Sequence, residues 1–133
     1  MKLIIHSDGG ARGNPGPAGI GVVIYNEKAK LVAEISRFLG VSTNNQAEYR
    51  ALIAGLEKAV ELGADSVDCY LDSELVVKQI NHEYKVKNKE LAPLFLKVYN
   101  LLTKFKSYNF RHVPREQNKE ADCLANEAMD RGK

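Results

Sequence analysis

Four acidic residues stand at positions where an acid normally costs stability. Asp8 and Asp72 end two apolar strands, and Glu48 and Asp122 border the apolar faces of two predicted helices. Carboxylates that are scattered along the chain but meet in the fold repel one another unless divalent cations neutralise them. Oxygen ligands of this kind favour Mg²⁺ or Mn²⁺ over Zn²⁺. The sequence therefore predicts a metal site that serves phosphoryl-transfer chemistry.

Each acid also has a simpler explanation when it is taken alone. Glu48 fits a first-turn acid favoured by the helix dipole, Asp122 fits a surface acid, and Asp72 fits a cap for the helix that follows. The combination favours the metal site. Two ions held roughly 4 Å apart by such carboxylates activate a water and stabilise the leaving oxygen of a phosphodiester.

Three strands are predicted at the start of the chain, over residues 2–8, 19–25 and 31–39. A glycine-rich turn over residues 9–17 separates the first two, so the three strands form an antiparallel meander. The run Leu3-Ile4-Ile5 is apolar on both sides, as in a central strand that is buried on both faces.

A long helix is predicted next, because Thr43 and Gln46 have the spacing of a capping box. It runs to about Leu62, and at about 100° per residue Glu48 borders its apolar stripe. A strand over residues 67–71 follows, with Val67, Cys69 and Leu71 on one face.

The remaining elements alternate between helix and strand. Helices are predicted over 73–82 and 89–106, a strand over 108–113, and a last helix from the turn at 114–117 to about Asp130. The order βββαβααβα predicts an α/β fold: a five-stranded mixed sheet, three antiparallel strands and then parallel additions, flanked by helices. Parallel neighbours would bring Asp8 and Asp72 to one edge of the sheet.

The composition sets limits on size and compartment. With 133 residues, 44% of them hydrophobic, the chain predicts one domain over 1–133. Cys69 and Cys123 form no metal-type pair and no disulfide framework, so we expect free thiols in a reducing compartment. The short apolar run near the N-terminus is neither a signal peptide nor a membrane span, and we expect a cytoplasmic protein that does not bind membranes.

The charge is mild overall but concentrated in one segment. A formal charge of +2 does not prove a nucleic-acid partner. From Lys78 to Lys106, however, the sequence contains seven lysines and only two glutamates, and Tyr84, Tyr99 and Phe105 lie among them. Lysines and aromatic rings together suit a nucleic acid, and lysines alone equally suit a solvated helix face.

The chain resembles type 1 ribonuclease H over essentially its whole length. Four motifs occur in that family's order: Asp8-Gly9-Gly10 with Gly13-Asn14-Pro15-Gly16, Thr43-Asn44-Asn45-Gln46-Ala47-Glu48, Leu71-Asp72-Ser73, and Asn118-Lys119-Glu120-Ala121-Asp122. The resemblance implies a ribonuclease H-like fold. It also implies endonucleolytic cleavage of the RNA strand of RNA/DNA hybrids, which leaves 5′-phosphate and 3′-hydroxyl ends.

The resemblance also implies roles for individual residues. It makes Asp8, Glu48, Asp72 and Asp122 catalytic residues that bind two Mg²⁺ or Mn²⁺ ions. It places contacts with the hybrid at Asn14, Thr43, Asn44, Asn45, Ser73 and Glu74. The helix that begins near Thr43 is independently suited to a phosphate. Amide and hydroxyl groups suit the RNA 2′-hydroxyl, and backbone contacts predict little dependence on base sequence.

The sequence departs from the family in its last loop. Many members carry a loop histidine that assists proton transfer or product release, whereas here only Pro-Arg-Glu-Gln separates Val113 from Asn118. His112 is expected on the strand, away from the metals. Arg115 is the better candidate for a catalytic role, because a permanent cation stabilises phosphate charge although it shuttles no protons.

A second departure is the absence of the basic protrusion that some members insert between the two middle helices. Hybrid binding would then rest on Lys85, Lys87, Lys89 and their neighbours, so we expect it to be weak and sensitive to salt. We expect a monomer without an obligate protein partner.

Two alternatives stay open at this stage. One is a nuclease of the same fold that acts on double-stranded RNA or DNA junctions. The other is a hybrid-binding module without turnover, against which the presence of all four acids argues. The choice between Mg²⁺ and Mn²⁺ stays open as well.

Overall fold

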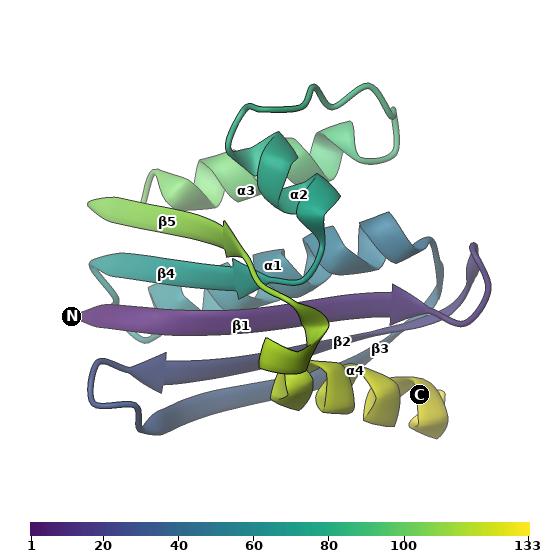
Figure 1. The fold of residues 1–133 in the computed structure, drawn as a ribbon, viewed down its shortest axis with the longest axis horizontal. Coiled ribbons are helices and arrows are strands. Elements are labelled where there is room, and N and C mark those ends of the chain that lie inside the picture. Colours follow the sequence, from purple (N-terminus) through teal and green to yellow (C-terminus); the bar gives the residue numbers. More distant parts are fainter.

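The computed structural model describes all residues from 1 to 133 and contains one mixed sheet of five strands (Figure 1). The strands are β1 (Lys2–Ala11), β2 (Gly16–Asn26), β3 (Leu31–Ser42), β4 (Ser66–Leu71) and β5 (Ser107–His112). Their order across the sheet is β3-β2-β1-β4-β5. The pairs β1–β2 and β2–β3 are antiparallel, and β1–β4 and β4–β5 are parallel. The predicted sheet is confirmed.

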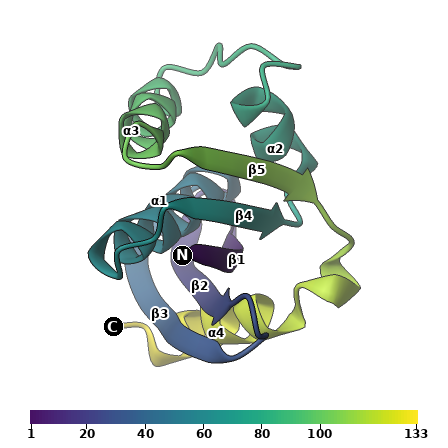
Figure 2. The same ribbon diagram turned by 90° about the vertical axis from the view of Figure 1, so that its left-hand side faces the viewer.

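Helices cover the two faces of this sheet unequally. They are α1 (Asn44–Glu61), α2 (Glu74–Ile80), α3 (Ala92–Leu102) and α4 (Lys119–Arg131), with a short 3₁₀ turn η1 (Arg115–Gln117) before the last one. In Figures 1 and 2, α1, α2 and α3 lie on one side of the sheet and α4 lies on the other. The predicted order of strands and helices is therefore confirmed.

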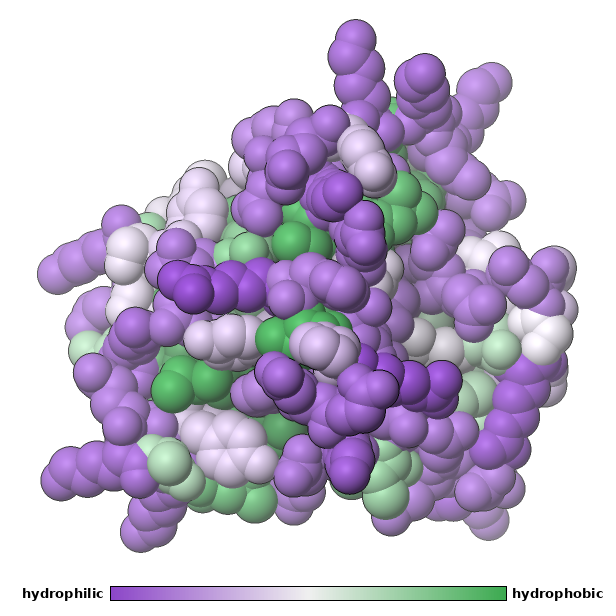
Figure 3. All heavy atoms as spheres, viewed as in Figure 1, coloured by the Kyte–Doolittle hydropathy of each residue, from purple (hydrophilic) through white to green (hydrophobic).

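The main core lies between the sheet and α1. Leu3 and Ile5 of β1 and Leu52 and Leu56 of α1 are almost completely buried there. The other face of the sheet is only partly covered, because α4 lies over β2, β3 and part of β1. Figure 3 shows apolar residues among hydrophilic ones on this face. The prediction that the first strand is buried on both faces was wrong for Ile4, which is only half-buried.

β1 is longer than predicted and changes the setting of the first acid. The strand runs to Ala11, because Gly9 and Gly10 pair with Ile20 and Gly19 of β2 instead of forming a turn. The predicted turn over 9–17 shrinks to the residues between Ala11 and Gly16. Asp8 consequently lies inside the strand, opposite Gly21, and not at its end.

α3 is shorter than the predicted helix over 89–106. It begins at Ala92 with Pro93 in its first turn, where a missing N–H costs nothing, and it ends at Leu102. Phe105 then turns back into the core, where it is 7% exposed, and half-buried Tyr99 packs against the same core. Two of the three aromatic residues among the lysines therefore serve packing, and only Tyr84 is exposed. No helix of the structure combines the length and apolar character needed to cross a membrane.

Candidate active site

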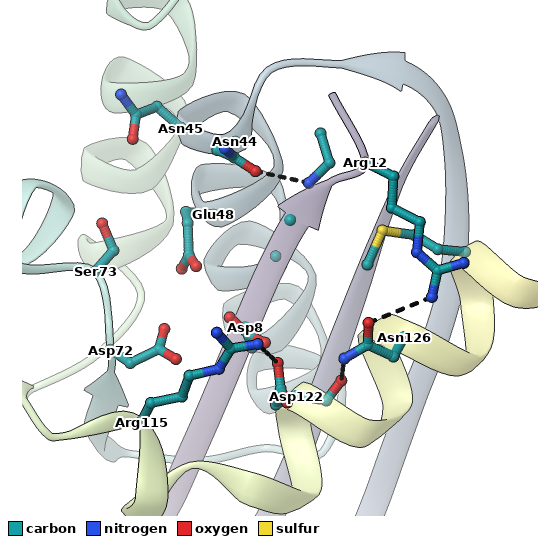
Figure 4. Close-up of a pocket in the computed structure, with 14 residues that line it drawn as sticks. Asp8, Arg12, Asn44, Asn45, Glu48, Asp72, Ser73, Arg115, Asp122 and Asn126 are labelled. Atoms are coloured by element: carbon teal, nitrogen blue, oxygen red, sulfur yellow. Dashed lines mark hydrogen bonds and ion pairs between the residues drawn. The ribbon is translucent and has the colours of Figure 1, made fainter. Parts of the chain in front are cut away.

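Three of the four predicted acids form a compact cluster (Figure 4). Asp8 comes from β1, Glu48 from the second turn of α1, and Asp72 from the residue that follows β4. One carboxylate oxygen from each lies within 4.8 Å of the others. Three elements that are far apart in sequence thus bring three carboxyl groups to one place, whereas the sequence predicted that four would meet.

Two glycines permit this convergence. A methyl group on Gly9 would lie 2.2 Å from the carbonyl oxygen of Ala47, so α1 approaches β1 only because that group is absent. A methyl group on Gly21 would lie 2.0 Å from the carbonyl oxygen of Ala121 in α4. Gly21 pairs with Asp8 across the ladder. The two helices that carry Glu48 and Asp122 are therefore held against β1 and β2 by backbone contact.

The first turn of α1 is fixed by reciprocal hydrogen bonds. Gln46 N–H donates to Thr43 Oγ1 (3.2 Å), and Thr43 N–H donates to Gln46 Oε1 (2.9 Å), which completes the predicted capping box. Asn44 N–H donates to Asn14 Oδ1 (3.1 Å), and Ala11 N–H donates to Asn44 Oδ1 (2.8 Å). These bonds join the loop after β1 to the start of the helix that presents Glu48.

The cluster is costly in the absence of a cation. Asp8 and Glu48 are each only 7% exposed. Burial, and next the charge of Asp72, raise the pKa of Asp8 to about 8. Burial, and next the charge of Asp8, raise the pKa of Glu48 well above its ordinary value. Glu48 Oε2 is buried and has no hydrogen-bond partner.

This environment fits a divalent metal ion. An unpartnered, buried carboxylate oxygen beside two further carboxylates is a poor arrangement for protein groups alone. Oxygen donors without nitrogen or sulfur are the ligand set of Mg²⁺, Mn²⁺ and Ca²⁺. The residues present therefore fit a hard divalent cation.

Asp122 lies beside the cluster and is paired with a cation. Arg115 Nη2 donates to Asp122 Oδ1 at 3.1 Å. The start of α4 is anchored by the fully buried Asn118, whose Nδ2 donates to the carbonyl oxygen of Ser7 at 2.8 Å. Asp122 is not within the 4.8 Å group. It nevertheless lines the same cleft as the three clustered acids.

The cleft has a volume of about 490 Å³ and is mostly polar. Its lining residues are Asp8, Gly9, Gly10, Ala11, Arg12, Asn44, Asn45, Glu48, Asp72, Ser73, Arg115, Asp122, Asn126 and Met129. Sequence reasoning missed Arg12, Asn126 and Met129. Arg12 Nη1 lies 2.6 Å from Asp130 Oδ1 of α4, a contact over more than a hundred residues that no local pattern reveals.

The six residues expected to contact a substrate divide into two groups. Asn44, Asn45 and Ser73 line the cleft. Asn14 and Thr43 do not line it, and their side chains instead bond the first turn of α1. Glu74 lies outside the lining too, and its Oε1 pairs with Lys78 Nζ at 2.9 Å.

The two candidates for the loop residue are also separated. His112 is the last residue of β5, as predicted, and does not line the cleft. Arg115, on η1, lines it and contacts the fourth acid. The structure therefore brings the arginine, and not the histidine, to the acids.

The fold and the acidic cleft together define the class of protein. A family model described as "Reverse transcriptase-like" matches residues 6–128. The chain is also 42% identical to ribonuclease H1 of the archaeon Halobacterium salinarum. That structure covers 98% of this chain, is itself covered to 99%, and has a TM-score of 0.96. The chain belongs to the ribonuclease H family.

Particular relatives add detail. The chain is 47% identical, over 98% of its length, to the "Bifunctional protein Rv2228c" of Mycobacterium tuberculosis, of which it covers 36%. The solved N-terminal ribonuclease H domain of that protein superimposes with a TM-score of 0.95. The structure of LC11-RNase H1 in complex with an RNA/DNA hybrid is 47% identical, with 97% of each chain covered and a TM-score of 0.92. The chain thus spans about a third of the length of the curated relatives it matches first.

Proposed function

We propose that the protein is a metal-dependent endoribonuclease that hydrolyses the RNA strand of RNA/DNA hybrids and leaves 5′-phosphate and 3′-hydroxyl ends. The observation that carries the proposal is the cluster of Asp8, Glu48 and Asp72, with ligand oxygens within 4.8 Å of one another and one buried oxygen unpartnered. A relative of similar length bound to an RNA/DNA hybrid supports the choice of substrate.

The three clustered acids would hold Mg²⁺ or Mn²⁺, two ions in the catalytic state, with Asp122 as the fourth acid. Bound ions of this kind supply an activated water and stabilise the leaving oxygen. The contribution of the chain is to hold the carboxylates in place before binding. Asp8 and Glu48 would hold such ions as ionised carboxylates, because a nearby positive charge favours the ionised form and offsets the burial that raises the pKa of each.

Two arginines would balance negative charge on the substrate. Arg115 lies beside Asp122, where a guanidinium stabilises the charge of a phosphate near the acids. Arg12 lines the same cleft. Neither side chain exchanges protons near neutral pH, so we assign them electrostatic roles and leave proton transfer to water.

The substrate contacts would lie on both sides of the acids. Asn44 and Asn45 at the start of α1 and Ser73 at the start of α2 present amide and hydroxyl groups that suit the RNA 2′-hydroxyl. In the first turn of α1 the N–H groups of Asn44 and Gln46 already donate to Asn14 and Thr43, so the helix dipole is what would favour a phosphate there. Asn14 and Thr43 would hold the first turn of α1 in place for the substrate. Glu74 would contact the substrate at the edge of the site. Backbone contacts of this kind predict cleavage with little dependence on base sequence.

The decisive experiment compares wild type and Asp72→Asn on an end-labelled hybrid, with and without Mg²⁺, and maps the cut strand. We expect metal-dependent cuts in the RNA strand only, lost in the variant while hybrid binding is retained. Asp65→Asn is the control, because Asp65 is exposed and pairs only with the N-terminus. Equal cleavage of double-stranded RNA or of a DNA junction would contradict the assignment of RNA/DNA hybrids as the substrate. Binding without any cleavage by the wild type would leave only a binding module.

We further propose a monomeric single domain that needs no protein partner for cleavage and works in a reducing, cytoplasmic environment. Cys69 and Cys123 are both free thiols, which supports the compartment. Sedimentation of the active protein tests the oligomeric state: activity confined to a dimer would contradict it.

A further inference from the structure

The three clustered acids come from separate parts of the chain, and backbone contacts fix two of the three distances between them. Asp8 and Asp72 lie on or next to the parallel neighbours β1 and β4, whose ladder sets their separation. Asp8 and Glu48 are held together because Gly9 allows α1 to touch β1. Glu48 and Asp72 lack such a link, since Glu48 is on α1, Asp72 lies just before α2, and no backbone hydrogen bond joins these helices.

A buried side-chain hydrogen bond joins α1 to α2 instead. The hydroxyl group of Tyr49 donates to Oε1 of Gln79 at 2.6 Å. Tyr49 directly follows Glu48 and is 0% exposed, and Gln79 lies in the last turn of α2 and is 5% exposed. It is the only side-chain hydrogen bond between the two helices. The helix that carries Glu48 and the helix that follows Asp72 are therefore connected through the interior of the protein.

This pair is polar at a place where an apolar pair would fill the same space. Val76, Val77 and Ile80 of α2 belong to the same apolar core cluster as Tyr49. A buried hydrogen bond between uncharged groups adds little net stability, because the unfolded chain bonds to water instead. Apolar surfaces slide past each other at small cost, whereas a hydrogen bond has a preferred length and direction. The pair therefore fixes the relative position of the two helices more than it stabilises the fold.

The Tyr49 hydroxyl group is a permanent donor in this bond. Burial raises the pKa of Tyr49 above its ordinary value, so the hydroxyl group keeps its proton throughout the physiological pH range. At about 100° per residue, Tyr49 points away from Glu48 around α1. Neither Tyr49 nor Gln79 lines the acidic cleft. The bond consequently leaves the cleft free for metal and substrate.

The position of Glu48 depends on the path of its helix. Glu48 Oε2 is buried and has no hydrogen-bond partner that would hold it. Figure 4 shows the side chains of Glu48 and Asp72 pointing into the same space from different elements. Contact with Gly9 fixes the path of α1 on the side of β1, and the bond from Tyr49 fixes it on the side of α2.

We propose that Tyr49 and Gln79 are positioning residues for the metal site, whose bond keeps α1 and α2 at the separation at which Glu48 and Asp72 bind the same cation. The inference rests on the proposed function, because it requires these acids to bind metal. Neither positioning residue touches the metal or the substrate. Without the bond, the two helices move apart under the repulsion between the acids, so metal binding weakens while the fold persists.

The test measures the Mg²⁺ dissociation constant of the metal-free protein by isothermal titration calorimetry, together with the melting temperature. Tyr49→Phe removes only the donor, and Gln79→Met removes the acceptor at similar size. Each variant should bind Mg²⁺ about fivefold more weakly or worse, at the lower end of the effect of groups that orient metal ligands. Each should also melt about 4 °C or more below the wild type, because one buried polar group loses its partner.

The double variant, Tyr49→Phe with Gln79→Met, separates positioning from stability. It leaves no polar group of the pair without a partner, so most of the lost melting temperature should return. Its Mg²⁺ affinity should stay as weak as that of the single variants, because no directed contact joins the helices. Recovery of Mg²⁺ affinity together with the melting temperature overturns the proposal, since the bond would then serve stability alone.

Tyr99→Phe is the matched control. Tyr99 of α3 also donates its hydroxyl group to α2, at the carbonyl oxygen of Ile80, but this bond does not involve α1. The variant should melt below the wild type and keep the wild-type Mg²⁺ dissociation constant. Equal weakening in this control, or unchanged Mg²⁺ binding in Tyr49→Phe, overturns the proposal and leaves the proposed function intact. A wild type that binds no Mg²⁺ contradicts the proposed function and this inference together.

Discussion

At the scale of single residues, the site consists of carboxyl groups whose ionisation opposes folding until a cation binds. Asp8 and Glu48 are buried next to each other and near Asp72, and their pKa values are raised for that reason. The acids were selected from the sequence by their combination and by the family motifs that contain them, because each acid alone has a simpler explanation. Arg12 was not evident, since its presence in the cleft depends on β1 and α4 meeting.

The raised pKa of Asp8 predicts how stability depends on pH without metal. In the folded protein the Asp8 carboxyl group stays protonated up to about pH 8. In the unfolded chain it loses its proton near pH 4. The folded state therefore binds more protons between these values, so stability falls as pH rises from about 4 to about 8. Asp8→Asn should be more stable than wild type at pH 8 in EDTA, by on the order of a few kcal/mol.

Thermal melts at pH 5 and pH 8 check this prediction. The advantage of Asp8→Asn should shrink at pH 5, and Mg²⁺ at pH 8 should stabilise the wild type much more than the variant. An advantage of equal size at both pH values would mean that the substitution acts through packing and not through the proton.

Arg115 gives a second prediction at this scale. Arg115→Ala removes the only ion pair of Asp122 and should lower kcat for hybrid cleavage by about 10² or more, as for other lost electrostatic stabilisers. Arg115→Lys keeps the charge and should retain more activity. Single-turnover rates at saturating hybrid are the measurement, with Arg111→Ala as control. An unaffected rate would mean that Arg115 plays no part in catalysis.

At the scale of elements, local signals positioned the start of α1 better than the end of β1. The capping box at Thr43 and Gln46 is a short-range pattern, and it forms as predicted. The ends of β1 were misjudged because Gly9 and Gly10 were interpreted as turn residues. Gly10 has ordinary space around it, but Gly9 serves close packing with α1. Such a requirement comes from tertiary contact and leaves no mark on the neighbouring sequence.

Gly21 tests how strongly α4 depends on this close packing. In Gly21→Ala the new methyl group would meet the Ala121 carbonyl oxygen at 2.0 Å, so α4 must move and take Asp122 with it. We expect a loss of about 2 kcal/mol or more of unfolding free energy, together with weaker metal-dependent cleavage. Denaturant unfolding and activity at a temperature where the variant is folded measure both.

Gly10→Ala is the matched control for that substitution. At Gly10 the nearest atoms to an added methyl group are 3.9 Å away, which is ordinary van der Waals distance. This variant should stay within about 1 kcal/mol of the wild type. Equal effects of the two alanines would show that the distance to α4 is not what matters.

At the scale of the whole molecule, topology was predictable and contacts between distant side chains were not. The alternation of elements implied the mixed sheet, and the family resemblance is confirmed by the match to ribonuclease H1 of Halobacterium salinarum over 98% of the chain. The extent of the domain and the roles of the site residues stay predictions. The bond between Tyr49 and Gln79 could not be foreseen, because the two residues come from separate helices with no shared motif.

Charge distribution makes the last prediction. Lys85, Lys87 and Lys89 are exposed in the stretch between α2 and α3 and have no carboxylate partner. Hybrid affinity should therefore fall steeply with salt, and Lys85→Ala with Lys87→Ala should lower the slope of log K against log salt by about 0.9 per lost contact. Lys28→Ala, in the hairpin between β2 and β3, should leave the slope unchanged. A flat salt response of the wild type would contradict this assignment.

The anchoring of α4 has a consequence for how the protein tolerates damage. Asp122 reaches the other acids only because this last helix lies on β2 and is tied to β1 through Asn118. Detachment of α4 alone would inactivate the site, although most of the sheet would stay folded. Catalytic turnover would thus report on the integrity of the entire polypeptide, and a proteolytic nick that releases this helix would inactivate the protein before spectroscopy registered unfolding.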